Sequence, residues 1–332
     1  MSQCKLNHSL LVAQNPNTGE ILALVSYPSF DPTDIGRAVG DKNNPFFNRA
    51  VQGNYPPGSV FKITSALAGL ESGRIDANWE VDDVGAFELG GERFSNWYFN
   101  QYGKKEGLVK IEKALARSND TYFYKLGEEI GLDALRKTAI ALGFGQKTGV
   151  DLPDEALGLV PDGVWKRASI GDEWYLGDTM HLMVGQGYML TTPIQVNGMT
   201  SYVASGKLTK PYIVSKIESG AGAGEISFGS TFLGGNVASA LNLQIVREGM
   251  KKTCETGGTG APFFRAKYKV ACKTGTAEEV GGKPHAWFTV FAPVENPQIV
   301  LTVLVERGGE GSAVAAPVAK EVLDWWTENR NR

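Results

Sequence analysis

The sequence predicts a mixed α/β fold of the α+β type, in which both ends of the chain form one sheet and a large helical part lies between them. Two strand-like segments open the chain, and three more stand near its end. The residues between them are dominated by amphipathic helical patterns. Since neither an internal repeat nor a low-complexity linker interrupts the chain, we expect one continuous domain over residues 1–332.

Each strand-like segment is an apolar run bounded by turn residues. The opening stretch SLLVAQNPNTGEILALVSYPSF predicts a β-hairpin around its NPNTGE turn. Near the other end, AKYKVACKTGT, HAWFTVFAPV and QIVLTVLVERGG predict three strands, and a helix should follow from about Ala315 to Trp326. We therefore expect residues of about 8–28 and 265–330 to form the sheet.

The middle of the chain, residues of about 55–260, should be mostly helical. Its clearest amphipathic patterns are LVKIEKALARSNDTYFYKLGEEIG, LDALRKTAIALGFG and ASALNLQIVREGMKK. These helices predict a large helical subdomain beside the sheet.

The composition is that of a globular protein that needs no polyanion partner. The chain has a formal net charge of −3 over 332 residues and no basic run, which argues against nucleic-acid binding. Its longest apolar runs, such as IVLTVLV at 299–305, are far shorter than the roughly 20 residues that a membrane helix needs. The N-terminus lacks a signal-peptide pattern, so an export or anchor segment of the native protein would be missing from this sequence.

Cysteines and histidines show no metal-ligand spacing. The three cysteines form no C-x-x-C pattern and cannot all pair, so we interpret them as plain thiols: Cys4, Cys254 and Cys272. The three histidines are scattered, which favours structural or surface roles: His8, His181 and His285. We therefore expect no metal and no other cofactor.

A serine and a lysine stand one helical turn apart in NYPPGSVFKITSALAGLESG, residues 54–73. The Pro-Pro pair stiffens the approach, Gly58 lets the chain turn, and apolar residues then recur at helical spacing, so Ser59 should lie near a helix N-terminus. Residues three apart share a helix face, so the Lys62 amine can reach the Ser59 hydroxyl as a base reaches its nucleophile. A capping serine with a solvated lysine is the alternative for any single Ser-x-x-Lys.

Lys273-Thr274-Gly275 stands at the end of a predicted strand and is followed by Thr276. This placement puts a cation and two hydroxyls on a sheet edge, where the Lys273 ammonium can meet a substrate carboxylate. Gly275 removes a side chain where a substrate backbone would have to approach closely. The same tripeptide recurs at 147–149 in FGQKTGVDLPDE, and we interpret that copy as a turn because no strand follows it.

Ser118-Asn119-Asp120 lies between two helical patterns, and such a tripeptide alone usually marks a cap or a turn. The order of the three patterns supplies the missing specificity. Ser-x-x-Lys at a helix start, Ser-x-Asp between helices and Lys-Thr-Gly on a late strand form the signature of serine acyl-transfer enzymes that act on penicillin.

With these motifs in order, the chain resembles the transpeptidase domain of class B penicillin-binding proteins, most of all the elongation-type penicillin-binding protein 2. The resemblance spans nearly the whole length and includes DPTDIG, NRAVQGNYPPGSVFK, SNDTYFYKLG, LGFGQKTGVDLP, VGQGYMLTTPIQV, ETGGTG and HAWFTVFAPVENPQIVLTVLVE. It implies a penicillin-binding, serine β-lactamase-like fold with a central antiparallel five-stranded sheet flanked by helices. Asp120 in place of the more familiar Asn, and the strand start HAWF, favour the elongation type over the septal type.

The resemblance also implies a mechanism. Ser59 would attack the penultimate D-Ala carbonyl of a peptidoglycan stem peptide and form an acyl-enzyme, which an amine of a neighbouring strand resolves. Lys62 would be the base, which requires partial burial and a second positive charge, that of Lys273. Ser118 would pass a proton to the leaving amine, and Asp120 would bind Lys62 and the substrate amide. Whether burial or the anionic Asp120 decides the pKa of Lys62 stays open.

Partners and location follow from the same resemblance. The ligands would be peptidoglycan stem peptides and β-lactam antibiotics, with the backbone N–H groups of Ser59 and Thr276 as the oxyanion hole. The native protein would work in cell elongation and shape with a glycosyltransferase, at the inner membrane, its catalytic domain on the periplasmic, extracytoplasmic face. The family's membrane anchor and pedestal domain are absent from this sequence, so we expect a soluble catalytic domain.

The chain departs from the family at two places. Some relatives carry a zinc site of Asp, His and Cys ligands before the second motif, but residues 82–117 contain neither His nor Cys, so we expect no zinc here. Cys272 stands where relatives often have Gly, and we expect its thiol to be partly accessible beside the active strand.

Two other functions remain open. A serine β-lactamase or β-lactam sensor shares the three motifs, although no E-x-x-L-N deacylation motif follows the second one here. A non-catalytic scaffold of the elongation machinery would keep the fold but break a motif, and none is broken.

Overall fold

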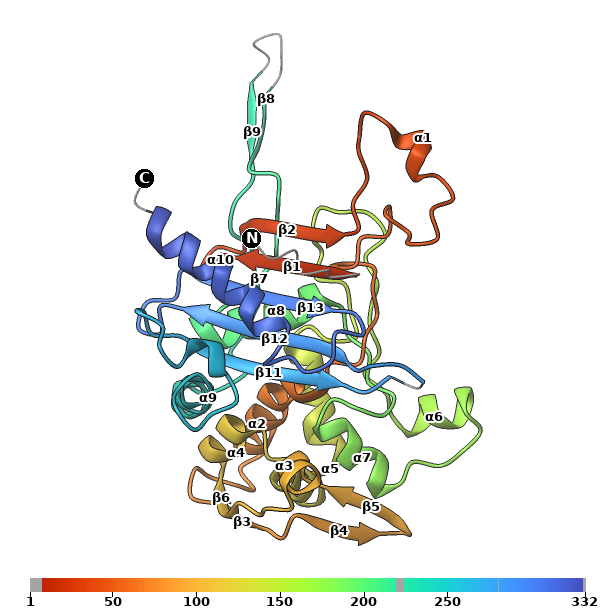
Figure 1. The fold of residues 1–332 in the computed structure, drawn as a ribbon, viewed down its shortest axis with the longest axis vertical. Helices are drawn as coiled ribbons and strands as arrows, with labels where there is room; N and C mark the ends of the chain where they lie inside the picture. Colours follow the sequence, from red (N-terminus) through yellow and green to blue (C-terminus); the bar gives the residue numbers. More distant parts are fainter. Residues whose placement is uncertain (1–7, 219–223, 280, 331–332) are drawn as a thin grey trace.

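The computed structural model describes residues 8–218, 224–279 and 281–330 (Figure 1). One sheet has the order β11-β12-β13-β1-β2, and every neighbouring pair is antiparallel. Its strands are β1 (Ser9–Gln14), β2 (Ile21–Tyr27), β11 (Ala271–Ala277), β12 (His285–Ala292) and β13 (Ile299–Val305). The predicted antiparallel five-stranded sheet is confirmed, and it leaves β11, with its Lys-Thr-Gly motif, at an edge.

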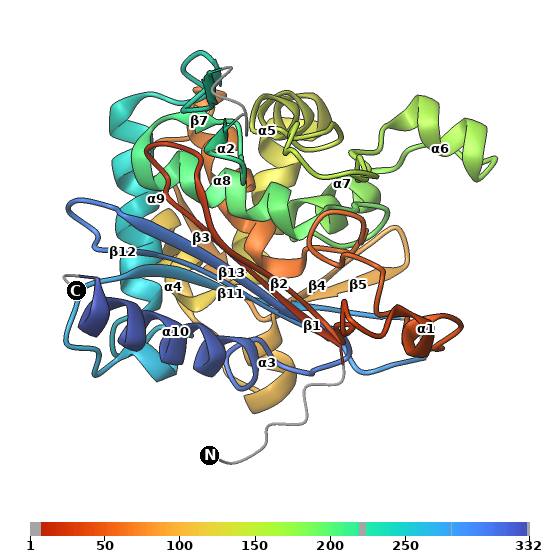
Figure 2. The same cartoon turned by 90° about the horizontal axis from the view of Figure 1, so that it is seen from above.

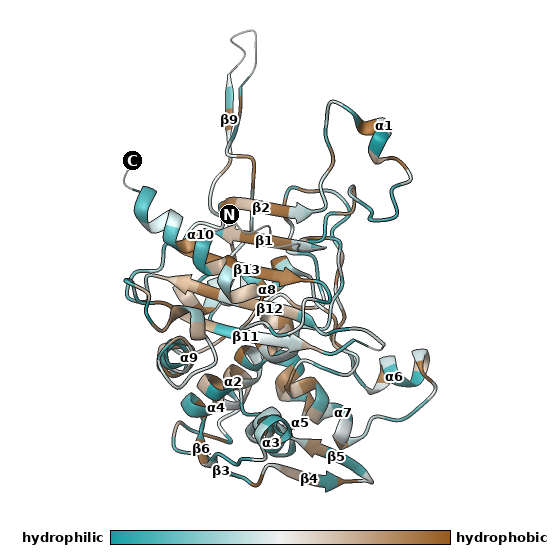
Figure 3. Ribbon diagram, in the orientation of Figure 1, coloured by the Kyte–Doolittle hydropathy of each residue, from teal (hydrophilic) through white to brown (hydrophobic). Residues whose placement is uncertain are grey.

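Helices cover both faces of this sheet (Figure 2). The C-terminal helix α10 (Ala315–Asn329) packs on β12 and β13 on one face, and α8 (Pro193–Ser205) packs on β1, β12 and β13 from the other. Figure 3 shows the brown, apolar central strands between these layers. Every residue of β12 and β13 is buried, because a strand covered on both faces has no solvent side.

The helical middle packs against the sheet beside β11 and encloses the larger hydrophobic core. The helix α5 (Asp120–Ala141) contacts α2 (Lys62–Glu71) and α7 (Leu176–Met183), and α9 (Ala240–Thr253) contacts β11. Two predicted helical patterns meet end to end in α5, where Gly131 has a φ of 73°. The other helices are α1 (Ile35–Ala38), α3 (Trp97–Tyr102), α4 (Ile111–Arg117) and α6 (Gly163–Ser169).

In the part of the chain that the structure describes, the middle region also contains four small two-stranded sheets that were not predicted. Their pairs are β3 (Glu80–Asp83) with β6 (Gly107–Lys110), β4 (Ala86–Leu89) with β5 (Glu92–Ser95), β7 (Leu208–Thr209) with β10 (Phe232–Gly234), and β8 (Lys216–Glu218) with β9 (Glu225–Ser227). Strands of two to four residues are too short to show a clear alternation of apolar and polar residues. Within the described ranges, no helix is long and apolar enough to cross a bilayer.

Candidate active site

Ser59 lies in a short 3₁₀-helix, Gly58–Phe61, that continues directly into α2. Lys62 is the first residue of α2, so the Ser-x-x-Lys pair starts a helix, as its sequence pattern predicts. Ser59 is half-buried, whereas Lys62 is fully buried, which exceeds the partial burial that we expected.

Glycines let the Ser59 turn pack tightly between β11 and the chain after α7. Gly58 has a φ of +55°, and its N–H donates to the carbonyl of Gly185 at 2.8 Å. A Cβ on Gly58 would lie 2.7 Å from the carbonyl oxygen of Thr276, and one on Gly275 would lie 3.0 Å from Val60. Glycine at 275 therefore makes room for the turn that carries the serine.

The Lys62 ammonium joins the first motif to the second. It donates hydrogen bonds to the Ser118 carbonyl at 2.8 Å, to Ser118 Oγ at 3.3 Å and to Asp120 Oδ1 at 2.5 Å. Within the described residues it makes no hydrogen bond with Ser59 Oγ. Of the two motif serines, Ser118 is therefore the one whose hydroxyl contacts the Lys62 ammonium.

The backbone between α4 and α5 explains how Ser118 and Asp120 reach Lys62. Ser118 ends α4 in the left-handed region, with a φ of 52°. Asn119 caps α5, and its side-chain oxygen accepts from the Tyr122 N–H at 2.8 Å. This tight turn directs both flanking residues of the motif to the buried lysine.

Burial decides the pKa of Lys62. It lowers the pKa by penalising the charged ammonium, while the charge and hydrogen bond of Asp120 oppose it, and the net direction is downward. The pKa of Lys273 falls well below its usual range, because the side chain is buried and the charge of Lys62 is close. The positive charges of the two buried lysines disfavour each other, so this pair favours a state in which one of the two amines is neutral.

The third motif lies on β11 with its side chains largely enclosed. The fully buried Lys273 donates from Nζ to the Thr274 carbonyl at 3.1 Å. Thr274 Oγ1 shares a hydrogen bond of 2.7 Å with Thr259 Oγ1 in the ETGGTG loop, residues 255–260. Thr276 is half-buried, and Gln186 donates to its carbonyl at 3.4 Å.

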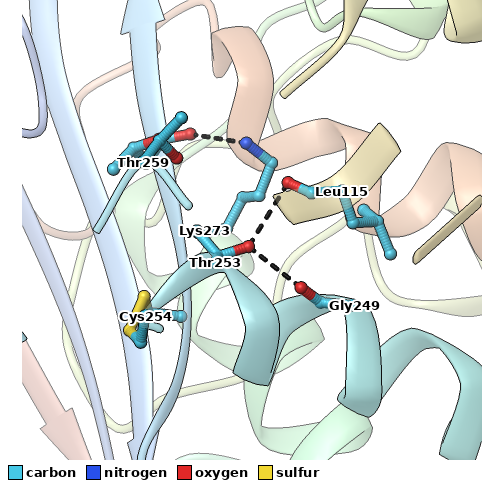
Figure 4. The surroundings of a disulfide bond; sticks show 8 residues. Leu115, Gly249, Thr253, Cys254, Thr259 and Lys273 are labelled. Carbon is cyan, nitrogen blue, oxygen red and sulfur yellow. Dashed lines mark hydrogen bonds between the residues drawn. A yellow bond between two sulfur atoms is a disulfide. The ribbon is translucent and has the colours of Figure 1, made fainter. Parts of the chain in front are cut away.

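A disulfide between Cys254 and Cys272 corrects our interpretation of the cysteines as plain thiols. Their Cα atoms lie 6.0 Å apart, because α9 packs on β11 and brings together residues 18 apart in the sequence. Figure 4 shows Cys254 near Thr259 and Lys273. The expected accessible thiol at Cys272 is also wrong, since this side chain is fully buried and bonded. Cys4 lies outside the described residues.

Sequence reasoning missed two residues that hold Asp120. The Trp97 N–H donates to Asp120 Oδ2 at 2.9 Å, and the Asp120 N–H donates to Asn96 Oδ1 at 3.2 Å. Both lie where β5 leads into α3, and no pattern in the sequence marks them. Among the described residues, no group of three His, Cys, Asp or Glu side chains could hold a metal.

Comparison with known proteins adds family evidence to this geometry. Residues 10–324 match the family model described as the penicillin binding protein transpeptidase domain. The curated peptidoglycan D,D-transpeptidase MrdA of Acinetobacter baumannii is 35% identical over 97% of this chain and 51% of its own length. The chain thus spans about half the length of the curated relatives it matches, including that of Escherichia coli, of which it covers 54%.

Solved structures agree with this match. Helicobacter pylori PBP2 in complex with MreC superposes with a TM-score of 0.82 at 33% identity, covering 97% of this chain and 60% of that one. The imipenem acyl-enzyme complex of penicillin-binding protein A from Mycobacterium tuberculosis gives 0.80 at 28% identity, covering 95% and 72%.

Proposed function

The chain belongs to the penicillin-binding protein transpeptidase family, and from this premise we propose that it is a serine-type peptidoglycan D,D-transpeptidase of the elongation type, inhibited by β-lactams. The observation that carries the proposal is the buried Lys62, which hydrogen-bonds Ser118 and Asp120 of the second motif, while Gly275 of the third motif packs against the turn that carries Ser59. Three sequence motifs thus meet at one base beside Ser59.

The contacts of Lys62 support a proton route for acylation. Neutral Lys62 takes the proton of Ser59 Oγ as that oxygen bonds to the penultimate D-Ala carbonyl. The tetrahedral intermediate then breaks its bond to the terminal D-Ala, whose amine takes a proton from Ser118 Oγ. Lys62 returns a proton to Ser118 across 3.3 Å, which closes the cycle and leaves an acyl-enzyme. The amine of a second stem peptide then attacks the acyl carbon and loses a proton to Lys62, and Ser59 Oγ leaves and takes that proton back from Lys62.

The β11 edge would hold the substrate. In this proposal the N–H groups of Ser59 and Thr276 stabilise the oxyanion, each worth about 3 kcal/mol of barrier. Thr274 and Thr276 bind the donor carboxylate, and Gly275 keeps the strand close to the serine turn. Lys273 is too buried for direct solvent contact. When Lys62 is neutral, the repulsion that lowers the pKa of Lys273 is absent, so in this proposal Lys273 carries the charge of the pair and sets a positive field beside Lys62 and the carboxylate.

The proposal extends to partners and location. The PBP2 of H. pylori forms a complex with MreC, and we expect the native protein to work likewise in a cell-elongation assembly that includes a glycosyltransferase. We place it at the inner membrane with this domain on the extracytoplasmic face. The Cys254–Cys272 disulfide supports an extracytoplasmic location of this domain, because disulfides persist in oxidising compartments.

A fluorescent-penicillin time course tests the proposed function against a serine β-lactamase and against a non-catalytic scaffold. A transpeptidase should take up one label per chain and hold it after free penicillin is removed. Loss of the label within minutes, with hydrolysed penicillin accumulating, would indicate a β-lactamase instead. A folded chain that takes up no label would support the scaffold alternative.

A further inference from the structure

We infer that Asp83 is a positioning residue for this active site, in that its buried carboxylate holds the segments that present Asp120 and Ser118 to Lys62. The inference rests on the proposed function. Asp83 ends β3 and is 1% exposed. Among the described residues it makes no hydrogen bond or ion pair with Lys62 or Ser59, so it would act through its neighbours.

Five donors from four segments converge on the Asp83 carboxylate. Oδ1 accepts from the Gly85 N–H at 3.0 Å and from Thr121 Oγ1 at 2.8 Å. Oδ2 accepts from the Glu106 N–H at 3.0 Å and from the two side-chain amides of Asn96 at 2.8 Å and Asn119 at 3.0 Å. The carboxylate therefore ties together the loop after β3, the start of α3, the loop before β6 and the start of α5.

Two of these donors lead directly to the active site. Asn96 gives its amide N–H to Asp83 and uses its oxygen to accept from the Asp120 N–H at 3.2 Å. Asn119 gives its amide N–H to Asp83 and uses its oxygen to cap α5. Each amide is thereby fixed in one orientation, since its donor and acceptor ends are both engaged.

The carboxylate is held by hydrogen bonds rather than by a cation. Burial raises the pKa of Asp83, but the bonds from Thr121, Glu106, Gly85 and Asn96 outweigh it, and the pKa is lowered. Within the described residues, Asp83 has no ion pair. Replacing one carboxylate oxygen of Asp83 should therefore leave buried N–H and O–H donors without an acceptor, but it should not leave a buried positive charge unpaired.

If Asp120 is held less firmly, the pKa of Lys62 should change. A residue that only stabilised the fold would not change that pKa, so the pH profile distinguishes a positioning role from a structural one. Asp120 raises the pKa of Lys62 by charge and by hydrogen bond, and Asp83 itself does not act on it. Lys273 on β11 and Tyr124 on α5 also face this pair, and the charges of Glu92 and Glu278 reach Tyr124. Among the described residues, none of these four side chains hydrogen-bonds Asp83. An Asp120 that is held less firmly would let the pKa of Lys62 fall further.

The test compares Asp83→Asn with Asp82→Asn by second-order penicillin acylation over a range of pH. Asp82 is the exposed neighbour on the same strand, so it controls for loss of a charge. Asp83→Asn should acylate roughly tenfold to a hundredfold more slowly at neutral pH, because the catalytic groups are misplaced. Its acid limb, the part of the pH–rate profile in which the acylation rate rises with pH, should move to lower pH. Asp82→Asn should keep the wild-type rate and the wild-type acid limb.

A second variant covers the case in which Asp83→Asn does not fold. Asn96→Ala keeps the Asp83 charge and four of its five donors but cuts the link to Asp120, so its acid limb should also move to lower pH. A lower rate with an unmoved acid limb in folded Asp83→Asn would overturn the inference, as would a wild-type profile in Asn96→Ala. Failure of the wild type to acylate would instead overturn the proposed function.

Discussion

The tripeptide Lys-Thr-Gly occurs twice in this chain, and its two copies have opposite surroundings. Lys273-Thr274-Gly275 lies within β11, paired with β12, and its lysine is fully buried. Lys147-Thr148-Gly149 lies in a loop with its lysine exposed. In that loop Glu155 accepts from the Thr148 N–H at 2.7 Å and from the Gly149 N–H at 3.0 Å.

The comparison shows that the chemical role of a short motif depends on the secondary-structure element in which it lies. In the loop copy, the Glu155 carboxylate accepts hydrogen bonds from the threonine hydroxyl and from two backbone N–H groups. These groups therefore stabilise a turn and are not available to a ligand. In the strand copy, the side chains stand beside a second buried lysine and the serine turn. The predictions below set the two copies against each other.

The largest difference should come from the lysines. Lys273→Ala should lower the second-order rate of penicillin acylation by several orders of magnitude, because it removes the positive field beside Lys62 and the substrate carboxylate. Lys147→Ala should keep the wild-type rate. Comparable losses in both variants would show that the strand copy has no special role.

The buried surroundings of the strand copy also predict a pH dependence. Lys62 acts as a base only when neutral, so acylation should rise with pH through its lowered pKa. Asp120 raises that pKa, so Asp120→Asn should move the acid limb to lower pH, while Glu155→Gln beside the loop copy leaves it in place. A limb that moves to higher pH in Asp120→Asn would contradict this assignment of the base.

A smaller effect should follow from the threonines. If Thr274 binds the donor carboxylate, wild type should prefer a penicillin over its methyl ester. Thr274→Val should lose much of that preference, roughly tenfold for one hydrogen bond to a charged group. Thr148→Val serves as the control and should keep it. An unchanged acid-to-ester ratio in Thr274→Val would move carboxylate recognition elsewhere, with Thr276 the next candidate.

The smallest effect on acylation should come from the disulfide, which holds the loop that carries Thr259 against Thr274. Cys254→Ser should lower the free energy of unfolding by about 3 kcal/mol, as expected for a closed loop of this length, and acylation by less than about tenfold. Mass spectrometry after alkylation of the denatured protein should find one free thiol without reduction and three with it. Three free thiols without reduction would contradict the pairing.

The sequence alone was sufficient to predict the features that depend on a local pattern of residues. The five strands, the helix start at Ser59 and the turn at 147–149 follow from periodicity and turn residues. The Cys254–Cys272 pair was missed because only the packing of α9 on β11 brings the two residues together. Asn96 and Trp97 were missed for the same reason, since their contacts with Asp120 join segments 24 and 23 residues apart.

The central claim, that the three motifs form one acylation site at Ser59, is tested most directly by intact-protein mass spectrometry after incubation with a penicillin. Wild type should gain the mass of one penicillin, peptide mapping should place it on Ser59, and Ser59→Ala should gain none. A normal adduct on Ser59→Ala, or an adduct that maps to another residue, would contradict the account.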